Sequence, residues 1–378
     1  MAAELGAPQE GVVRGHRDRV PPRPAVRLAS RLRYLLLRVA DRLLPAHIAV
    51  VEHAHRFAVA HLLSSVAELG VADHLADGPK TAGQLARLTG ADAVALHRAL
   101  RAAAVVGIVQ LDRAGRFHET RLTRPLRTGH LSAAGEWCRY IGSPSLQAAW
   151  ADLAQTVRSG DSAFRRVNGS DPFSWFAAHP DEGRHFTLGL GGLTRSEAAM
   201  IIAAYPFPDE GVVCDVAGGE GVLLGEILRA HPALRGILVE SPLVLAEAKS
   251  YFDALGIGDR VELVEGDFFD GFEARADVYV LKWVLHDWDD PTCERIIGKV
   301  AETMPSGSKL VVIEGEQKAN VPDPRFSMID AQMLVITDGG RERDGAEIET
   351  LVAKAGLTLG TRRHTATDLL LVEASTAG

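Results

Sequence analysis

Ionisable side chains follow an apolar run at residues 278–290, Val-Tyr-Val-Leu-Lys-Trp-Val-Leu-His-Asp-Trp-Asp-Asp. The run begins with residues that suit a strand buried on both faces of a sheet, and it continues into Lys282, His286 and Asp287. Open α/β sheets build their ligand sites at the carboxyl ends of such strands. An imidazole with a pKa of about 6.5 can accept a proton at neutral pH. The stretch therefore predicts a reactive site, against the alternative of an acidic loop on the solvated surface.

A glycine-rich turn at residues 215–221, Asp-Val-Ala-Gly-Gly-Glu-Gly, is expected between a strand and a helix. Its glycines let the backbone approach a ligand closely. The spacing differs from the G-x-G-x-x-G of dinucleotide sites, and Glu220 places negative charge where a phosphate would bind. Glu240 ends the next strand about 20 residues on, where a carboxylate can hold both ribose hydroxyls. A nucleoside without phosphate fits this pattern best.

Asp267 and Phe268 follow a third strand, within Gly-Asp-Phe-Phe. The carboxylate of Asp267 can accept from an adenine amino group, and the ring of Phe268 can cover the base. A phosphate-free nucleoside that carries a cationic sulfonium near acidic groups describes S-adenosylmethionine, which is the predicted cofactor. No metal site or disulfide framework is indicated, because the three cysteines are widely separated and form no CxxC pair.

Strands and helices alternate after residue 206, which predicts an α/β domain with a largely parallel, doubly wound sheet. This domain would position all the residues named above. Predicted strands lie at 211–214, 237–239, 261–264, 276–281 and 309–313, with closing strands near 357–363 and 368–373, and predicted helices lie at 220–229, 243–255, 291–303, 325–335 and 345–355.

The amino-terminal part is predicted to be a helical, winged-helix domain at residues 26–130. Residues 1–25 are rich in proline and arginine and offer little to bury, so a flexible tail is expected there. Leucines at helical spacing between residues 26 and 44 predict an amphipathic helix. We expect it to lie on a partner subunit rather than on a membrane surface, because nothing else in the chain supports membrane binding. Two short helices ending at residue 106, and a small hairpin at 108–120, complete the winged-helix pattern.

The winged-helix pattern also raises a DNA-binding alternative. The second helix contains His97, Arg98 and Arg101, but its first turn lacks Arg, Lys, Asn and Gln, and its alanine-rich faces suit packing. A structural or dimerising role is therefore preferred.

Residues 131–205 form a predicted helical segment that is rich in aromatic side chains. These side chains could form an ordinary core, or several could wall a pocket for a flat apolar ligand. The sequence leaves both interpretations open. The aromatic residues are Trp137, Tyr140, Trp150, Phe164, Phe173, Trp175, Phe176 and Phe186.

Composition excludes several classes of protein. A chain of 378 residues with 47% hydrophobic content is expected to form two domains, and a net charge of −8 argues against a polyanionic partner for the whole molecule. The first thirty residues lack the apolar core of a secretory signal, and no run reaches the roughly 20 uncharged residues of a membrane-spanning helix. We expect a cytoplasmic protein that inserts into no membrane and binds no nucleic acid.

Four blocks occur in order along the chain: residues 215–221, Glu240-Ser241-Pro242, Gly266-Asp267-Phe268-Phe269, and Leu-Lys-Trp-Val-Leu-His-Asp-Trp at 281–288. Together they resemble the S-adenosylmethionine-dependent O-methyltransferases of the plant caffeate type, whose bacterial relatives methylate aromatic polyketides and other secondary metabolites. The resemblance covers roughly residues 26 to 375. It implies a Rossmann-like class I methyltransferase domain at 206–378, a winged-helix dimerisation domain, a homodimer and a small aromatic acceptor.

The resemblance also implies roles for individual residues. His286 matches the general base, and Glu314 and Glu342 match the two carboxylates beside it. One of these carboxylates would accept from the second ring nitrogen and stabilise the imidazolium. The matched cofactor-binding residues are Ala217, Gly218, Glu240, Asp267, Phe268, Lys282 and Arg184.

Two positions depart from the family pattern. Ala217 stands where the family usually has glycine, which would be tolerated if its φ is negative. Residues 189–192, Gly-Leu-Gly-Gly, lack the methionine often found at that pocket position, so the acceptor is less defined than the cofactor. Two rival functions remain: the same cofactor site used for hydroxylation, decarboxylation or pericyclic chemistry, and a DNA-binding regulator that senses a small molecule.

Overall fold

The computed structural model describes residues 20–376, so most of the predicted tail at 1–25 lies outside the described residues. The first described helix, α1, spans Arg23–Arg42. The chain forms two compact units. Among the described residues, one contains 20–32, 152–171 and 194–376, and the other contains Arg33–Ala151 and Pro172–Leu193.

The larger unit is built on a seven-stranded sheet with the order β6-β5-β4-β7-β8-β10-β9. Neighbouring strands from β6 to β8 run parallel, while β10 is antiparallel to both β8 and β9. The predicted, mostly parallel α/β fold is confirmed. The strands are β4 Glu210–Val216, β5 Ala233–Glu240, β6 Val261–Glu265, β7 Val278–Lys282, β8 Lys309–Gly315, β9 Thr358–His364 and β10 Leu369–Ser375.

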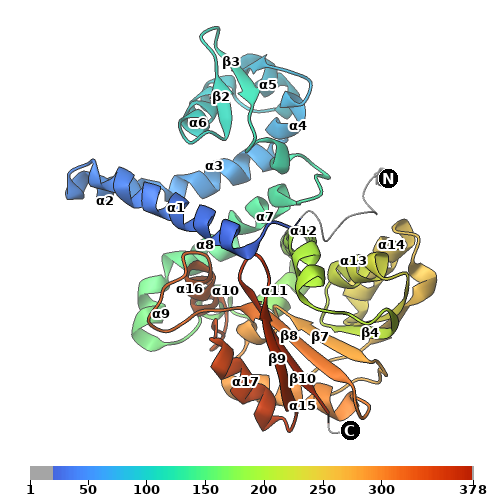
Figure 1. The fold of residues 1–378 in the computed structure, drawn as a ribbon. Helices are drawn as coiled ribbons and strands as arrows, with labels where there is room; N and C mark the ends of the chain where they lie inside the picture. Colours follow the sequence, from blue (N-terminus) through green and yellow to red (C-terminus); the bar gives the residue numbers. More distant parts are fainter. Residues whose placement is uncertain (1–19, 377–378) are drawn as a thin grey trace. The chain divides into compact units, whose positions relative to one another are not determined.

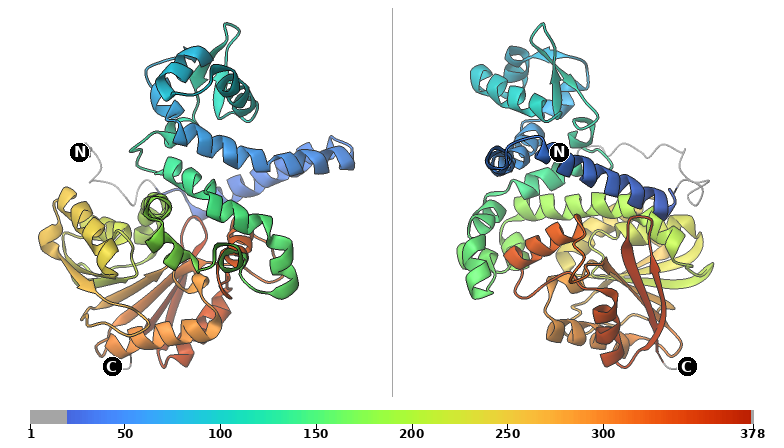
Figure 2. Two further views of the ribbon diagram at one scale, coloured as in Figure 1. Left: turned by 180° about the vertical axis from the view of Figure 1, so that it is seen from behind. Right: turned by 60° about the vertical axis from the view of Figure 1, so that its left-hand side comes forward.

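Helices cover both faces of this sheet (Figures 1 and 2). Successive side chains of β7 explain why: Tyr279 and Leu281 pack with α15 and α17, whereas Val278 and Val280 pack with α13, α14 and the end of α12. The helices of this unit are α9 Leu153–Ser159, α10 Ala163–Asn168, α13 Val222–Ala230, α14 Pro242–Ala254, α15 Asp290–Thr303, α16 Phe326–Ile336 and α17 Gly345–Lys354, together with the second half of α12 Pro180–Ala204.

Side-chain caps define where the helices near the site begin. Asp289 accepts from the amide of Thr292 at 3.0 Å and starts α15. Asp344 and Glu347 form a capping box at the start of α17. These caps fix the two chain segments that leave β7 and approach α17, and both segments contribute residues to the site described below.

The strand order reverses beside β4, because β5 and β6 lie on one side of it and β7 and β8 on the other. Ligands of open α/β sheets bind at the carboxyl ends of the strands at such a switch point. The turn at 215–221 leaves β4 here, and the turn at 283–287 leaves β7 here. The fold therefore brings together the two stretches that the sequence singled out.

The other unit contains a three-stranded sheet of order β1-β3-β2 packed with short helices (Figure 1). Thr81 forms a capping box with Gln84 at the start of α5, and Asp92 caps α6. This is the predicted winged-helix arrangement. Its elements are α2 Ala46–His55, α3 Phe57–Glu68, α4 Val71–Leu75, β1 Lys80–Thr81, α5 Ala82–Thr89, α6 Ala93–Val105, β2 Val109–Leu111, β3 Arg116–Glu119, α7 Ala134–Ile141, α8 Pro144–Ala151 and α11 Pro172–Ala178. Among residues 20–376, no helix has the length and hydropathy needed to cross a bilayer.

Four aromatic rings of this unit pack on one another. Tyr140 is buried and lies 5.2 Å from Trp137, 5.9 Å from Phe176 and 5.1 Å from Phe186, measured between ring centroids. Such mutual packing is that of a hydrophobic core. The alternative that some of these side chains wall an acceptor pocket stays a prediction.

Candidate active site

The glycine-rich turn is left-handed at three positions after β4 ends at Val216. Ala217, Gly219 and Gly221 have φ values of 56°, 59° and 74°. The condition under which alanine would replace glycine here without strain, a negative φ, is therefore not met. The turn requires a left-handed residue here to pass from strand to helix, and the Ala217 amide is held by the carbonyl of Val239 at 2.9 Å. For a residue with a Cβ this conformation costs roughly 1–2 kcal/mol.

Gly218 is required for a different reason, because its neighbours leave no room for a side chain. A Cβ at this position would lie 2.5 Å from the carboxylate of Asp215 and 2.8 Å from Leu238. Glu240, at the carboxyl end of β5, accepts from the amides of Gly219 at 3.1 Å and Ser241 at 2.8 Å. Burial raises the pKa of Glu240. These hydrogen bonds hold the glycine-rich turn against Glu240, the predicted ribose carboxylate.

Asp215 lies beneath this turn and is fully buried. Within the described part of the chain, neither of its carboxylate oxygens has a hydrogen-bond partner. Burial raises its pKa to about 7, although the charge of Lys282 opposes this shift. The sequence analysis assigned Asp215 no role of its own, and only its place as the last acidic residue of the strand could have signalled one.

Asp267 and Phe268 follow β6 at the same edge of the sheet. Asp267 is exposed, and its carboxylate accepts from the amide of Phe269 at 2.8 Å. The ring of Phe268 is half-buried and lies 4.6 Å from Phe269 and 6.3 Å from Trp288. The pair presents a carboxylate beside an aromatic surface.

Lys282 ends β7 and is paired inside the protein. Its Nζ lies 3.1 Å from the carboxylate of Glu197 and donates to the hydroxyl of Thr194 at 3.0 Å, and its side chain is only 7% exposed. Trp283 follows with a φ of 54°, which is left-handed. No local pattern could signal this pairing, because Glu197 lies 85 residues earlier on α12.

His286 sits in a short 3₁₀ turn, Leu285–Asp287, and its side chain is 12% exposed. Its Nδ1 lies 2.8 Å from Oε1 of Glu342, whose side chain is fully buried. An ionised carboxylate can only accept, so this contact assigns the proton to Nδ1 and leaves Nε2 as the second basic position. Of the two predicted carboxylates, Glu342 is the one that contacts the ring.

Glu314 contacts the backbone of the turn that carries His286. One of its oxygens accepts from the backbone amides of Val284 at 3.1 Å and Leu285 at 2.8 Å. It therefore orients the turn that carries His286 and makes no hydrogen bond to the ring itself. Its charge still acts on the imidazole.

Carboxylates dominate the electrostatics around His286. Burial lowers the pKa of the ring, but Asp287, the hydrogen bond and charge of Glu342, and Glu314 together raise that pKa to about 10. Oδ1 of Asp287 lies 3.6 Å from Nε2, and burial raises the pKa of Asp287 to about 6. Burial also raises the pKa of Glu314 to about 7. Asp287, which the sequence analysis gave no role, is thus a neighbour of the ring.

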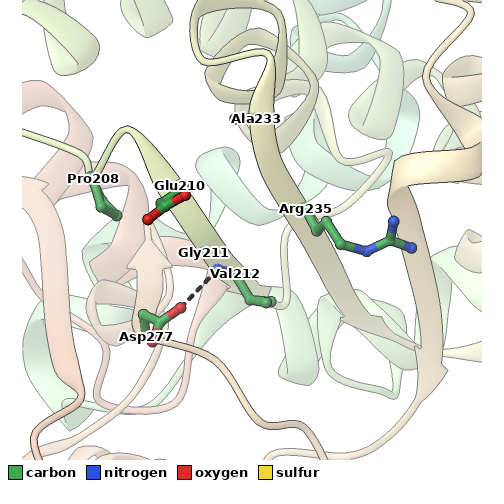
Figure 3. A pocket seen from close by; sticks show the side chains of 7 residues that line it. All are labelled: Pro208, Glu210, Gly211, Val212, Ala233, Arg235 and Asp277. Atoms are coloured by element: carbon green, nitrogen blue, oxygen red, sulfur yellow. Dashed lines mark hydrogen bonds between the residues drawn. The ribbon is translucent and has the colours of Figure 1, made fainter.

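A separate hollow of about 640 Å³ opens at the amino ends of β4 and β5. Figure 3 shows Asp277 bonded to the amide of Val212 and Arg235 pointing away from it. This hollow lies at the edge of the sheet opposite to the predicted residues. The candidate active site is therefore the carboxyl edge.

Comparison with known proteins agrees with this geometry. The O-methyltransferase domain matches residues 150–358, and the O-methyltransferase dimerisation domain matches residues 51–128. Phenazine O-methyltransferase PhzM of Lysobacter antibioticus is 37% identical over 322 residues, covering 84% of this chain and 92% of the relative. The chain belongs to the O-methyltransferase family.

Solved structures of O-methyltransferases resemble most of this fold. The crystal structure of LaPhzM has a TM-score of 0.84 at 34% identity and covers 88% of this chain and 100% of that chain. The O-methyltransferase NcsB1 from neocarzinostatin biosynthesis, in complex with S-adenosyl-L-homocysteine and 1,4-dihydroxy-2-naphthoic acid, has a TM-score of 0.71 at 31% identity. The match covers 84% of this chain and 96% of that chain. The protein is an S-adenosylmethionine-dependent O-methyltransferase of secondary metabolism, and the predicted family, enzyme class and cofactor are confirmed.

The residues of this O-methyltransferase fit a nucleoside cofactor. Gly219 leaves open space where a Cβ would stand, and the buried, unpartnered carboxylate of Asp215 lies under the same turn. Glu240 and Asp267 add carboxylates at the ends of the next two strands. Arg184 is exposed on the part of α12 that belongs to the other compact unit, and its predicted role stays a prediction.

Arg343 of the O-methyltransferase is a positioning candidate that the sequence analysis missed. Its guanidinium is 2% exposed and donates to the carbonyls of Leu285 and Trp288, each at 2.7 Å, and to Asp290 at 2.9 Å. Glu342 and Arg343 thus hold the ring of His286 and the backbone on both sides of it. The only signal in the sequence is that Arg343 is adjacent to Glu342.

Proposed function

We propose that this O-methyltransferase methylates a hydroxyl, phenolic in character, on a small aromatic secondary metabolite, with His286 as the general base. The observation that carries the proposal is the contact of Nδ1 with Glu342, which leaves Nε2 to accept a proton. The aromatic acceptor is supported by the relatives, since NcsB1 binds a dihydroxynaphthoic acid and PhzM acts on a phenazine.

When bound, the cofactor supplies an electrophilic methyl group on a sulfonium. The protein must align the acceptor oxygen and remove its proton. His286 takes the proton at Nε2 while Glu342 keeps Nδ1 protonated and stabilises the imidazolium. Asp287, 3.6 Å from Nε2, stabilises the same positive charge.

The raised pKa of His286 favours proton transfer from a phenol but leaves less of the ring in its basic form at neutral pH. A phenol has a pKa of about 10, so transfer of its proton to a ring with a similar pKa is nearly balanced. In the resting site, however, the ring is mostly protonated at neutral pH. Activity should therefore rise with pH as the ring loses that proton.

The proposed cofactor residues lie at the carboxyl ends of successive strands. The backbone of Ala217 and Gly218 would meet the methionine part, and Glu240 would bind the ribose. Asp267 and Phe268 would bind adenine. Lys282 would complete the cofactor site.

A homodimer is proposed through the amino-terminal region. The dimerisation domain matches residues 51–128, and α1 exposes a row of leucines, including Leu28 and Leu32. A row of exposed leucines along one helix is typical of a subunit interface. Light scattering coupled to size-exclusion chromatography should give twice the mass of the chain.

The His286→Ala variant tests the assignment of the base. Loss of a general base lowers kcat by about 10²- to 10⁴-fold. Turnover of phenolic acceptors would be measured by transfer of labelled methyl, and cofactor binding by titration with S-adenosylhomocysteine. We expect turnover to fall and binding to persist. If the variant keeps the turnover of the wild type between pH 6 and 9, the assignment of His286 as the base is contradicted.

A further inference from the structure

Glu197 is a buried carboxylate that no predicted role explains. Its side chain is 6% exposed and lies on α12, in the same compact unit as β7. It contacts Nζ of Lys282 at 3.1 Å, accepts from Nε1 of Trp283 at 3.2 Å, and accepts from the guanidinium of Arg325. Burial raises its pKa, but the charges of Lys282 and Arg325 and the hydrogen bonds lower it more. The group is therefore ionised.

Two of these three contacts fall on adjacent residues that face different parts of the site. Lys282 is the proposed cofactor residue, and its Nζ is also held by Thr194, one turn before Glu197 on α12. Trp283 follows in the left-handed conformation, and its amide donates to the carbonyl of Ile313 at 3.0 Å. A left-handed tryptophan persists only where its surroundings hold it.

The indole of Trp283 connects Glu197 to the catalytic turn. Its ring lies 4.9 Å from the imidazole of His286 and 6.3 Å from Phe326. The ring is therefore held by Glu197 through Nε1 and packs against the imidazole of the proposed base. The indole of Trp283 therefore connects Glu197 to His286 directly.

We propose that Glu197 is a positioning residue for both halves of the active site. Its carboxylate fixes the ammonium of Lys282 on the cofactor side and fixes the indole of Trp283 as the wall behind His286. This inference rests on the roles proposed above for Lys282 and His286.

Two variants separate the two halves. Glu197→Gln keeps an oxygen for the indole N–H but removes the charge that holds Lys282, so the Kd for S-adenosylhomocysteine should rise about tenfold with little change in kcat. Trp283→Phe keeps a ring but removes the N–H, so kcat should fall about five- to tenfold with the Kd unchanged. Thr194→Val provides a milder test of the lysine half, with a rise of about threefold in the Kd.

Glu373→Gln is the matched control. Glu373 accepts from the hydroxyl of Tyr205 at 2.9 Å and from Nζ of Lys309 at 3.2 Å, an aromatic donor and a lysine like those of Glu197. This control should change thermal stability without changing kcat or the Kd. The inference is overturned if Glu197→Gln and Trp283→Phe change stability only, as the control does, or change both constants together. Full activity of His286→Ala would instead overturn the proposed function, so the two failures are distinguishable.

Discussion

The carboxyl and amino edges of the seven-stranded sheet carry charged groups in different states. At the carboxyl edge, both oxygens of Asp215 and one oxygen each of Glu314 and Glu342 lack a hydrogen-bond partner within residues 20–376. Trp283, at the same edge, is left-handed. Buried carboxylates in this state reduce stability.

Toward the amino edge, the charges are satisfied. Glu373 is bonded to Tyr205 and Lys309, and Asp277 accepts from the amide of Val212 at 2.8 Å. Both edges belong to one sheet with one core on each face, so packing alone does not account for the difference. The buried carboxylates that lack hydrogen-bond partners therefore lie at the edge where the enzyme must bind a ligand and move a proton.

Among changes at the carboxyl edge, Glu342→Gln is expected to have the largest effect on activity. Removal of the charge lowers the pKa of His286 toward its ordinary value, so the rise of activity with pH should move to lower pH. The loss of imidazolium stabilisation should lower the maximal kcat by about 10- to 100-fold. A pH profile of kcat for both proteins measures the two effects. A lower kcat with the profile in its original position would contradict the electrostatic account.

Arg343→Lys should lower kcat by about tenfold without moving the pH profile. Lysine keeps the charge but cannot span the carbonyls of Leu285 and Trp288, so the turn loses its geometry while the carboxylates around His286 remain. Arg362→Lys is the control, because Arg362 pairs with Glu349 rather than with the backbone around His286. A shifted profile in Arg343→Lys, or an unchanged kcat, would show that the guanidinium does not position the turn.

Asp215→Asn should stabilise the protein, and more so at high pH. The pKa of Asp215 rises from 3.8 to about 7 on folding, so ionisation penalises the folded state increasingly between those values and constantly above them. The melting temperature of the variant should therefore exceed that of the wild type by more at pH 8 than at pH 5. A gain that is equal at both pH values would mean that folding does not raise the pKa of Asp215.

Ala217→Gly should give the smallest effect. Relief of the left-handed strain offsets the greater flexibility of glycine in the unfolded chain, for a net gain of about 0.5–1 kcal/mol in the free energy of unfolding. Ala301→Gly, inside α15, should instead lose about 1 kcal/mol. Chemical denaturation compares the two. Destabilisation by Ala217→Gly would show that the turn selects alanine for its packing.

Local pattern was sufficient to predict most of the catalytic domain. The strand that precedes Lys282 was predicted at 276–281 and lies at Val278–Lys282, and the helix predicted at 291–303 is Asp290–Thr303. Alternating apolar residues, capping residues and glycines act over a few residues, so their effect can be seen in the chain. The same local reasoning left the φ of Ala217 open, because a residue type alone does not give the sign of φ that a particular turn requires.

The sequence by itself determined the family, the α/β fold, the cofactor class and His286 as the candidate base. The tertiary structure alone decided which carboxylate contacts the ring, that Glu314 holds the backbone amides, and that Glu197 pairs with Lys282 across 85 residues. The physical reason is that such contacts depend on the position and direction of side chains from different strands and helices. The charged residues at 278–290 find their partners only when the fold brings β7, β8 and α12 together.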